Sequence, residues 1–262
     1  MSLFVHELRQ TRKSLLIWTV SIASLNILCL FLFPEIRKQM KDLNALFSSM
    51  GAFSSALGMD QLNIGTLPGF FSIECGSILG LGGGLFAAIL GGTMVSKEEH
   101  THTADFLFAH PISRTEVLLQ KLAALAVQIV VLNLMVLFAD LLVIRLIGEN
   151  IPWNDILLIH LAYFLLQLEI GSLCFSLSAL SHENPLGLCI GITFGLYCMN
   201  LAANLSSSLE WLCWLTPYAY CEGSWIIEHG ALNLTYLFSG LLISMMTLLA
   251  SFVFFSRKDL RV

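Results

Sequence analysis

The chain has 262 residues, of which 56% are hydrophobic and only 12% are charged, and its formal net charge is −5 at pH 7. Soluble domains carry about 25% charged residues, so this chain has roughly half of the charge that a water-facing surface needs. The composition excludes a soluble globular domain and indicates an integral membrane protein. For a membrane protein the net charge says little about nucleic acid, and no basic block or zinc-ligand spacing suggests a nucleic acid as partner.

Six stretches of the sequence are apolar and long enough to cross a bilayer, which takes about 20 residues in a helix. The first stretch lacks a small-x-small cleavage site, so we expect it to remain as a span and not to be removed as a signal peptide. No short repeat or low-complexity linker divides the chain. We therefore predict an all-α integral membrane protein with six transmembrane helices in a single membrane domain over residues 1–262. The six stretches are about 14–33, 70–95, 117–147, 155–180, 185–203 and 234–255.

Most basic residues fall at one end of the predicted bundle. Six spans place both termini on the same side, and the positive-inside rule makes the basic side cytoplasmic. One cluster conflicts with this topology, because Arg37, Lys38 and Lys41 fall on the outer side. Apolar residues at alternating four- and three-residue spacing from Ile36 to Met50 predict an amphipathic helix on the outer interface there. The basic residues on the cytoplasmic side are Arg9, Arg12, Lys13, Lys97, Arg114, Lys121, Arg257, Lys258 and Arg261.

The segment between the second and third spans, SKEEHTHTADFLFAHPISRTEVLLQKL, is crowded with polar residues. Ser96 and Ser113 each begin a capping box with glutamate three residues later, which predicts a helix start at each serine. Pro111 ends the first helix, because the residue before a proline is pushed out of helical geometry. A short helix with an apolar tip at 104–108 is typical of a docking element; a helix that buries its phenylalanines in lipid is the alternative.

The same segment resembles the loop between helices two and three of type-2 ABC transporter permeases, the ABC-2 family, in its small bacterial six-span members. There an acidic cluster precedes a short helix that ends in an L-x-x-x-P-I-S-R run, which this chain repeats as LFAHPISR. The runs LGMDQLNIGTLPGFFSIECGSIL and WLTPYAY also resemble parts of that family, although many relatives have glycine in place of His102. The matching residues of the segment are Glu98, Glu99, Thr103, Phe106, Leu107, Pro111, Ile112, Ser113 and Arg114.

The resemblance implies a permease subunit of an ATP-driven exporter, which forms the translocation path as a dimer with a second copy or a related permease. Two separate ABC ATPase subunits would receive the short cytoplasmic helix, the coupling helix, in a groove. Phe106 and Leu107 would fill that groove, while Glu98 and Glu99 would pair with its basic rim. The residues expected to couple to the ATPase are Glu98, Glu99, Thr103, Phe106, Leu107, Pro111, Ser113 and Arg114.

The chain itself carries no motif for ATP hydrolysis. Its glycine run GSILGLGGG lacks the lysine that holds phosphates in a nucleotide-binding loop. We therefore expect no enzymatic activity and no cofactor bound by this chain, with ATP used by the partner subunits. On family grounds the expected substrate is an amphipathic peptide or drug, and the expected location is the cell membrane.

Glycines recur at helical spacing on the second and fifth spans. Gly80 and Gly84 form one ridge, and Gly187, Gly191 and Gly195 form another. Such ridges let helix backbones approach closely in lipid. The resemblance places both helices beside the path between protomers, so the ridges are expected in the translocation path or in dimer packing. Packing inside one subunit explains them equally well.

Three carboxylates, Glu74, Asp140 and Glu169, fall within the apolar spans. A charge at mid-bilayer costs about 2.5–3.5 kcal/mol, so each is expected to face protein or water. We expect Asp140 to form a structural pair with Arg145, and Glu169 to serve either as a polar contact on the translocation path or structurally. As a proton relay, the three carboxylates would instead make the chain an ion-coupled secondary transporter, which is the alternative function.

The loop before the last span holds several Trp and Tyr side chains and is predicted to form an aromatic belt or a re-entrant loop on the outer side. The spacing of Cys213 and Cys221 in this loop permits a disulfide without requiring one. No metal site is expected, because His100 and His102, two apart on a helix, point about 200° away from each other.

Overall fold

The computed structural model of the chain describes residues 3–39, 62–100 and 113–258. Within these ranges all regular elements are helices, and six helical stretches are long and apolar enough to cross a membrane. The prediction of an all-α protein with six spans is confirmed. The spans are α1 (Leu3–Lys38), α4–η1–α5 (Leu67–Ser77, Ile78–Gly82 and Gly83–Met94), α8 (Arg114–Leu146), α9 (Trp153–Leu180), α10 (Leu186–Leu205) and α12 (Leu234–Arg257).

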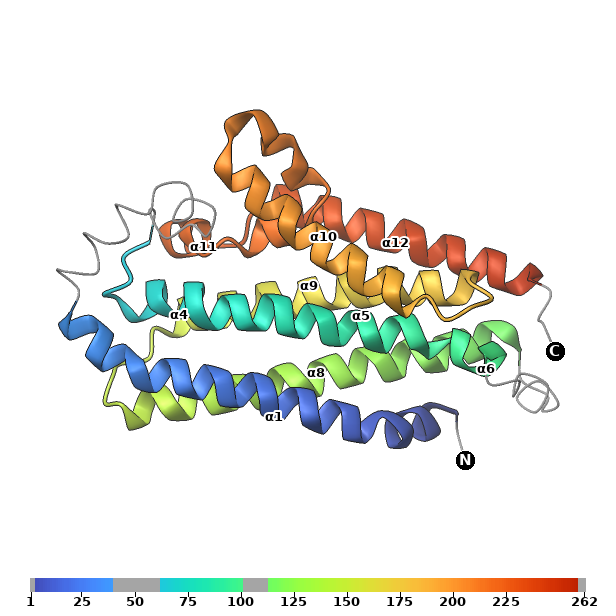
Figure 1. The fold of residues 1–262 in the computed structure, drawn as a ribbon, viewed down its shortest axis with the longest axis horizontal. Coiled ribbons are helices and arrows are strands. Elements are labelled where there is room, and N and C mark those ends of the chain that lie inside the picture. Colours follow the sequence, from blue (N-terminus) through green and yellow to red (C-terminus); the bar gives the residue numbers. More distant parts are fainter. Residues whose placement is uncertain (1–2, 40–61, 101–112, 259–262) are drawn as a thin grey trace.

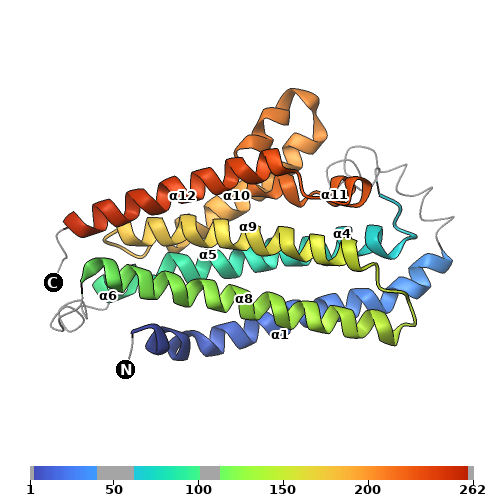
Figure 2. The same cartoon turned by 180° about the vertical axis from the view of Figure 1, so that it is seen from behind.

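The spans form two layers. Helices α1, α5 and α10 face the viewer in Figure 1, and α8, α9 and α12 face the viewer from behind in Figure 2. The short helix α6 (Ser96–His100), the start of α1 and the end of α12 lie at one end of the bundle, which we call the α6 end. The opposite end, the α11 end, holds the start of α4 and the short helix α11 (Gly223–His229). The 3-10 helices η2 (Ser207–Trp214) and η3 (Pro217–Cys221) connect α10 to α11.

Helix α1 is longer than the sequence predicted. It begins at Leu3 and continues through Pro34 to Lys38, so the expected break after Phe33 is absent. Arg37, on the extra turn, donates to the Glu149 carboxylate beyond α8 at 2.7 Å, an exposed ion pair worth at most about 1 kcal/mol. The rest of the predicted amphipathic helix, from residue 40 onwards, lies outside the described residues.

The two predicted capping boxes differ in outcome. Ser113 is the N-cap of α8, and its hydroxyl accepts a hydrogen bond from the Glu116 amide at 3.2 Å, as predicted. Helix α6 begins at Ser96 as expected, while Glu99, the other half of that capping box, lies outside the described side chains. The Ser96 hydroxyl donates to the Gly92 carbonyl at 3.2 Å, because α5 runs into α6 across a single residue and the preceding turn offers that acceptor.

Glycines let α5 and α9 approach each other closely. A Cβ on Gly91 would lie 2.4 Å from the Gly171 carbonyl oxygen, and one on Gly83 would lie 2.1 Å from the Gln167 side-chain nitrogen. The space at Gly83 admits a buried hydrogen-bond chain, in which Asn133 donates to Gln167 at 2.7 Å and Gln167 donates to the Leu79 carbonyl at 3.4 Å. This chain joins α8, α9 and the π-helical turn η1 inside the membrane-spanning part.

A second buried polar contact joins α1, α8 and α9. Asn26 donates to the Asp140 carboxylate at 3.0 Å, and His160 Nε2 lies 3.2 Å from the same oxygen. Asp140 is therefore structural and faces protein, as expected, but the predicted partner Arg145 is wrong. Residues five apart on a helix point about 140° away from each other, which leaves Arg145 on the exposed side of α8.

Replacing Gly91 with alanine should destabilise the protein. The new methyl group meets backbone atoms of α9, which cannot move aside as a flexible side chain can, so we expect the free energy of unfolding to fall by about 2–3 kcal/mol. Gly191→Ala is the matched control, because a Cβ there meets nothing within 4 Å in the part of the chain that the structure describes. Thermal unfolding in mild detergent measures both; equal unfolding temperatures for the two variants would contradict the close packing of α5 on α9.

Candidate functional site

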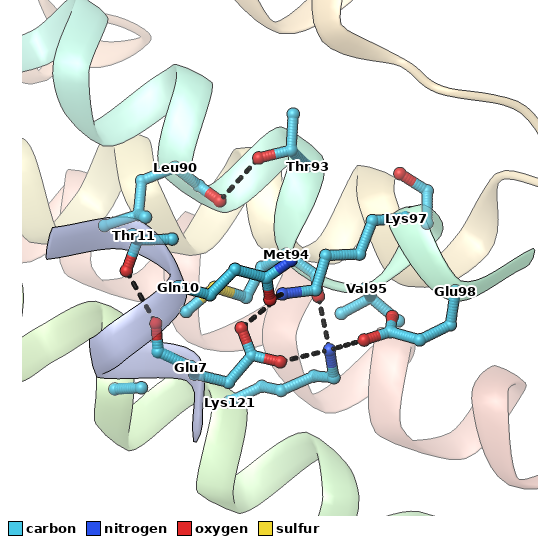
Figure 3. Close-up of polar contacts among 12 residues, drawn as sticks. Glu7, Gln10, Thr11, Leu90, Thr93, Met94, Val95, Lys97, Glu98 and Lys121 are labelled. Atoms are coloured by element: carbon cyan, nitrogen blue, oxygen red, sulfur yellow. Dashed lines mark hydrogen bonds and ion pairs between the residues drawn. The ribbon is translucent and has the colours of Figure 1, made fainter. Parts of the chain in front are cut away.

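Four charged side chains from three helices form a cluster at the α6 end, directly before the segment 101–112 that the sequence singled out. The cluster, called the basal ion cluster, consists of Glu7 on α1, Lys97 and Glu98 on α6, and Lys121 on α8 (Figure 3). Residues far apart in the chain thus meet directly before residues 101–112, which we call the coupling segment because they include Phe106 and Leu107, predicted to contact an ATPase.

Lys121 is the centre of the basal ion cluster. Its side chain is 1% exposed, and its ammonium donates to Glu7 Oε1 at 2.9 Å, to the Met94 carbonyl at 2.6 Å and to the Glu98 carboxylate. An ammonium has three N–H donors, so every donor of this buried charge is used. The Met94 contact also satisfies a carbonyl at the end of α5. The Lys121 Nζ atom, on α8, therefore contacts α1, α5 and α6 at once.

Glu7 is fully buried and lies between the two lysines. One carboxylate oxygen accepts from Lys121 and the other from Lys97, which also donates to Gln10 at 2.8 Å. Burial lowers the pKa of the Lys97 ammonium, as does the nearby Lys121 charge, while Glu7 opposes both effects. Two acids and two amines leave the cluster without net charge, which is how buried charges are tolerated.

Two further contacts fix the start of α6. The Ser178 hydroxyl near the end of α9 accepts from the amides of Val95 and Ser96 at 3.1 and 2.9 Å, the donors that a helix start leaves without an internal partner. The Phe4 amide donates to Gln120 on α8 at 3.1 Å and ties the first turn of α1 to the same end.

The C-terminal turns of α9 and α12 are capped by cations. Arg114, at the start of α8, donates to the carbonyls of Phe255 and Lys258, and Lys258 donates to the carbonyls of Ala179 and Ser181. Positive charge at a helix C-terminus is favoured by the helix dipole and by the free carbonyl groups. The residues on both sides of the coupling segment are therefore bound to the ends of the spans.

Of the predicted coupling residues, the structure describes the side chains of Glu98, Ser113 and Arg114. Glu98 pairs with Lys121, Ser113 caps α8, and Arg114 binds the end of α12. The others lie outside the described side chains: Glu99, Thr103, Phe106, Leu107 and Pro111. Sequence analysis missed Glu7 altogether, since 114 residues separate it from Lys121. Its only signal is a lone carboxylate just before an apolar span.

The two predicted glycine ridges lie in different surroundings. A Cβ on Gly80 would lie 2.8 Å from the Tyr163 ring, and one on Gly84 would lie 2.8 Å from the Tyr218 hydroxyl, so both glycines pack inside the subunit. Cβ atoms on Gly187, Gly191 and Gly195 would meet no atom of the described residues within 4 Å. The ridge on α10 is open.

The remaining carboxylates are also separated by the fold. Glu169 is 2% exposed and faces α12, where a Cβ on Gly240 would lie 2.2 Å from its Oε2. Glu74 is exposed on the surface of α4. In the loop before α12, Cys213 and Cys221 are not bonded to each other, since both thiols are free. The described part of the chain contains no group of three or more residues that could hold a metal ion.

Removing the lysine at the centre of the basal ion cluster should cost stability. In Lys121→Met, Glu7 and Glu98 lose a buried counter-charge, and we expect the free energy of unfolding to fall by about 3 kcal/mol. Adding Glu7→Gln to that variant should recover part of the loss. Lys13→Met, an exposed lysine on α1, is the control with a change below about 0.5 kcal/mol. Equal unfolding midpoints for the two lysine variants would contradict a buried, paired Lys121.

Comparison with known proteins shows the family to which the chain belongs. The family model described as ABC-2 family transporter protein matches residues 1–260, which include all six spans, the basal ion cluster and the coupling segment. A comparison with curated proteins gives no match. Six apolar helices and this family together make the chain a multi-pass membrane protein that works with ABC ATPase subunits. The chain therefore belongs to the ABC-2 family of transporter proteins, as a membrane-spanning permease subunit of an ABC transporter.

Proposed function

We propose that this permease is the membrane part of an exporter that pairs with a second permease and couples to two ATPase subunits through the segment after α6. The observation that carries the proposal is the basal ion cluster, because it binds the start of that segment to two spans at once. A displacement of α6 by an ATPase would be passed to α1 through Glu7 and to α8 through Lys121. Motion at the ATPase would thus reach the membrane-spanning part through paired, largely buried charges.

Glu98 has a definite place in this mechanism. Its carboxylate binds Lys121, so it acts as an anchor at the foot of the coupling segment. Arg114 is the matching anchor on the far side, since it binds the end of α12. Phe106 and Leu107, between the two anchors in sequence, would provide the apolar contact with the ATPase, and ATP would be bound and hydrolysed by the partner alone.

The open ridge of α10 supports a permease dimer. Gly187, Gly191 and Gly195 present backbone without side chains, and small residues are what lets two helices approach in lipid. Glu74 lies exposed on α4 in the same layer, the one facing the viewer in Figure 1. A carboxylate in a membrane-spanning helix needs protein or water beside it. A second permease on this layer would provide both, with the path for an amphipathic peptide or drug between the two subunits.

The basic residues favour the α6 end as the cytoplasmic side. Arg9, Arg12, Lys97, Arg114 and Lys121 all lie there, as the positive-inside rule requires of a cytoplasmic face. Both termini would then be cytoplasmic in the cell membrane, where ATP is available to the partner subunits.

Association with the ATPase should depend on the apolar tip of the coupling segment. In Leu107→Glu, a charge replaces the side chain expected in the groove, and we expect the amount of ATPase that copurifies with the tagged permease to fall at least about tenfold. Leu215→Glu makes the same change at an exposed position near the other end of the bundle and should leave the amount unchanged. Copurification undiminished by Leu107→Glu would overturn the proposed coupling.

Pairing of two permeases should depend on the α10 ridge. Gly191→Leu fills the open face of the helix, and we expect native mass spectrometry of the complex to show fewer particles with two permease subunits than for the natural chain. Ser21→Leu enlarges a residue on the exposed side of α1 and serves as the control. If both variants retain two permeases, the α10 ridge does not form the dimer contact.

A further inference from the structure

A single hydroxyl joins the start of α6 to α9. Ser178 lies in the last turn of α9 and is fully buried, and its oxygen accepts hydrogen bonds from the amides of Val95 and Ser96 at 3.1 and 2.9 Å. The same hydroxyl donates to the Ser96 hydroxyl at 3.2 Å. A serine hydroxyl has two acceptor positions and one donor, so every hydrogen-bonding position of Ser178 is used at this one place.

The place that Ser178 contacts is the junction between α5 and α6. Helix α5 ends at Met94 and α6 begins at Ser96, so Val95 alone separates them, with φ −104° and ψ −43°. An α-helical residue has φ near −63°, so the backbone departs from the helix at this residue. The angle between two helices joined by one such residue depends on the contacts that hold the junction, and Ser178 provides them from a neighbouring span.

This contact differs from the basal ion cluster in what it joins. The four residues of the cluster lie on α1, α6 and α8, and their ion pairs connect these helices. Ser178 connects the same end to α9 instead. The bonds that it accepts come from backbone amides, so they hold the backbone of the junction itself and not the end of a flexible side chain.

Helix α9 leads from this junction towards the α11 end of the subunit. Tyr163 lies about 22 Å from Ser178 along the helix, at 1.5 Å per residue. There it packs closely on the α4–η1 part of the second span, since Cβ atoms on Gly76 and Gly80 would lie 2.9 and 2.8 Å from its side chain. Gln167, between the two levels, donates to a carbonyl of η1 at 3.4 Å. A displacement of α9 would therefore reach the π-helical turn.

We infer that Ser178 is a positioning residue for coupling, which fixes the angle between α5 and α6 and makes α9 follow α6 when an ATPase moves it. The inference rests on the proposed function, because it takes the segment after α6 as the contact with the ATPase. Motion of α6 would act on the amides of Val95 and Ser96, and Ser178 would pass it to α9. At the far end, Tyr163 would act on η1, and π-helical turns occur often at functional sites.

The contact itself is tested on the purified subunit in mild detergent, without an ATPase, by hydrogen–deuterium exchange and mass spectrometry. In the natural chain, the peptide that covers Val95 and Ser96 should exchange as slowly as α5 does. Ser178→Ala removes the acceptor, and exchange of that peptide should become at least about tenfold faster, as expected for the loss of a hydrogen bond. Ser176→Ala is the matched control, because that buried hydroxyl donates to the Ser172 carbonyl within α9 at 2.9 Å. Fast exchange in the natural chain, or equal exchange in the two variants, would overturn the inference.

Transmission along α9 is tested on the complex of permease and ATPase in lipid nanodiscs. Addition of ATP should change the exchange of the peptide from Trp153 to Tyr163 in the natural chain and in Ser176→Ala. The change should be lost in Ser178→Ala, although the ATPase copurifies as before. An undiminished change in Ser178→Ala, or no change in the natural complex, would overturn the inference while the proposed function stands. Absence of an ATPase from the natural complex would overturn the proposed function, and the inference with it.

Discussion

The structure depends most on one constraint: a buried ammonium must have every N–H paired. Lys121 meets this constraint with Glu7, Glu98 and the Met94 carbonyl, and these three acceptors come from α1, α6 and the end of α5. A slide of α1 along α8 by one turn would leave at least one charge without a partner. A buried ion pair adds little net stability, but removing one partner costs several kcal/mol because the other charge stays buried. The cluster therefore specifies the register of α1, α6 and α8.

Deeper in the bundle, buried polar side chains fix the positions of the helices relative to one another. Lipid is as apolar as leucine, so helices in a membrane are held by close packing and by polar contacts and not by the hydrophobic effect. Asn133 and Gln167 join α8 and α9 to the π-helical turn, and Asp140 joins α8 to Asn26 and His160. Glycines on α5 supply the packing. The two layers are thus fixed to each other at several depths.

The spans and the Ser113 cap could be predicted because they follow from neighbouring residues. Length, hydropathy and a capping box are local properties, and the family resemblance rested on one continuous segment. The pairing of Glu7 with Lys121 could not be predicted, since it depends on which helices lie side by side. The glycines make the same point: Gly80 and Gly191 stand in similar ridges, yet a Cβ on Gly80 would meet a tyrosine ring and one on Gly191 would meet none of the described residues. Asp140 found its partners on α1 and α9 and not along its own helix.

The two ends of the subunit are built for different tasks. At the α6 end, ion pairs and capped carbonyls bind five spans, so motion imposed there moves them together. In helix α10, 17% of the most apolar stretch is buried against 61% for α9, and Cβ atoms on Gly187, Gly191 and Gly195 would meet no described residue within 4 Å. The most apolar stretch of α12 is also 17% buried, but Arg114 binds its last turn at the α6 end. A displacement of α10 relative to α1, α6 and α8 would therefore break few of the polar contacts that the structure describes.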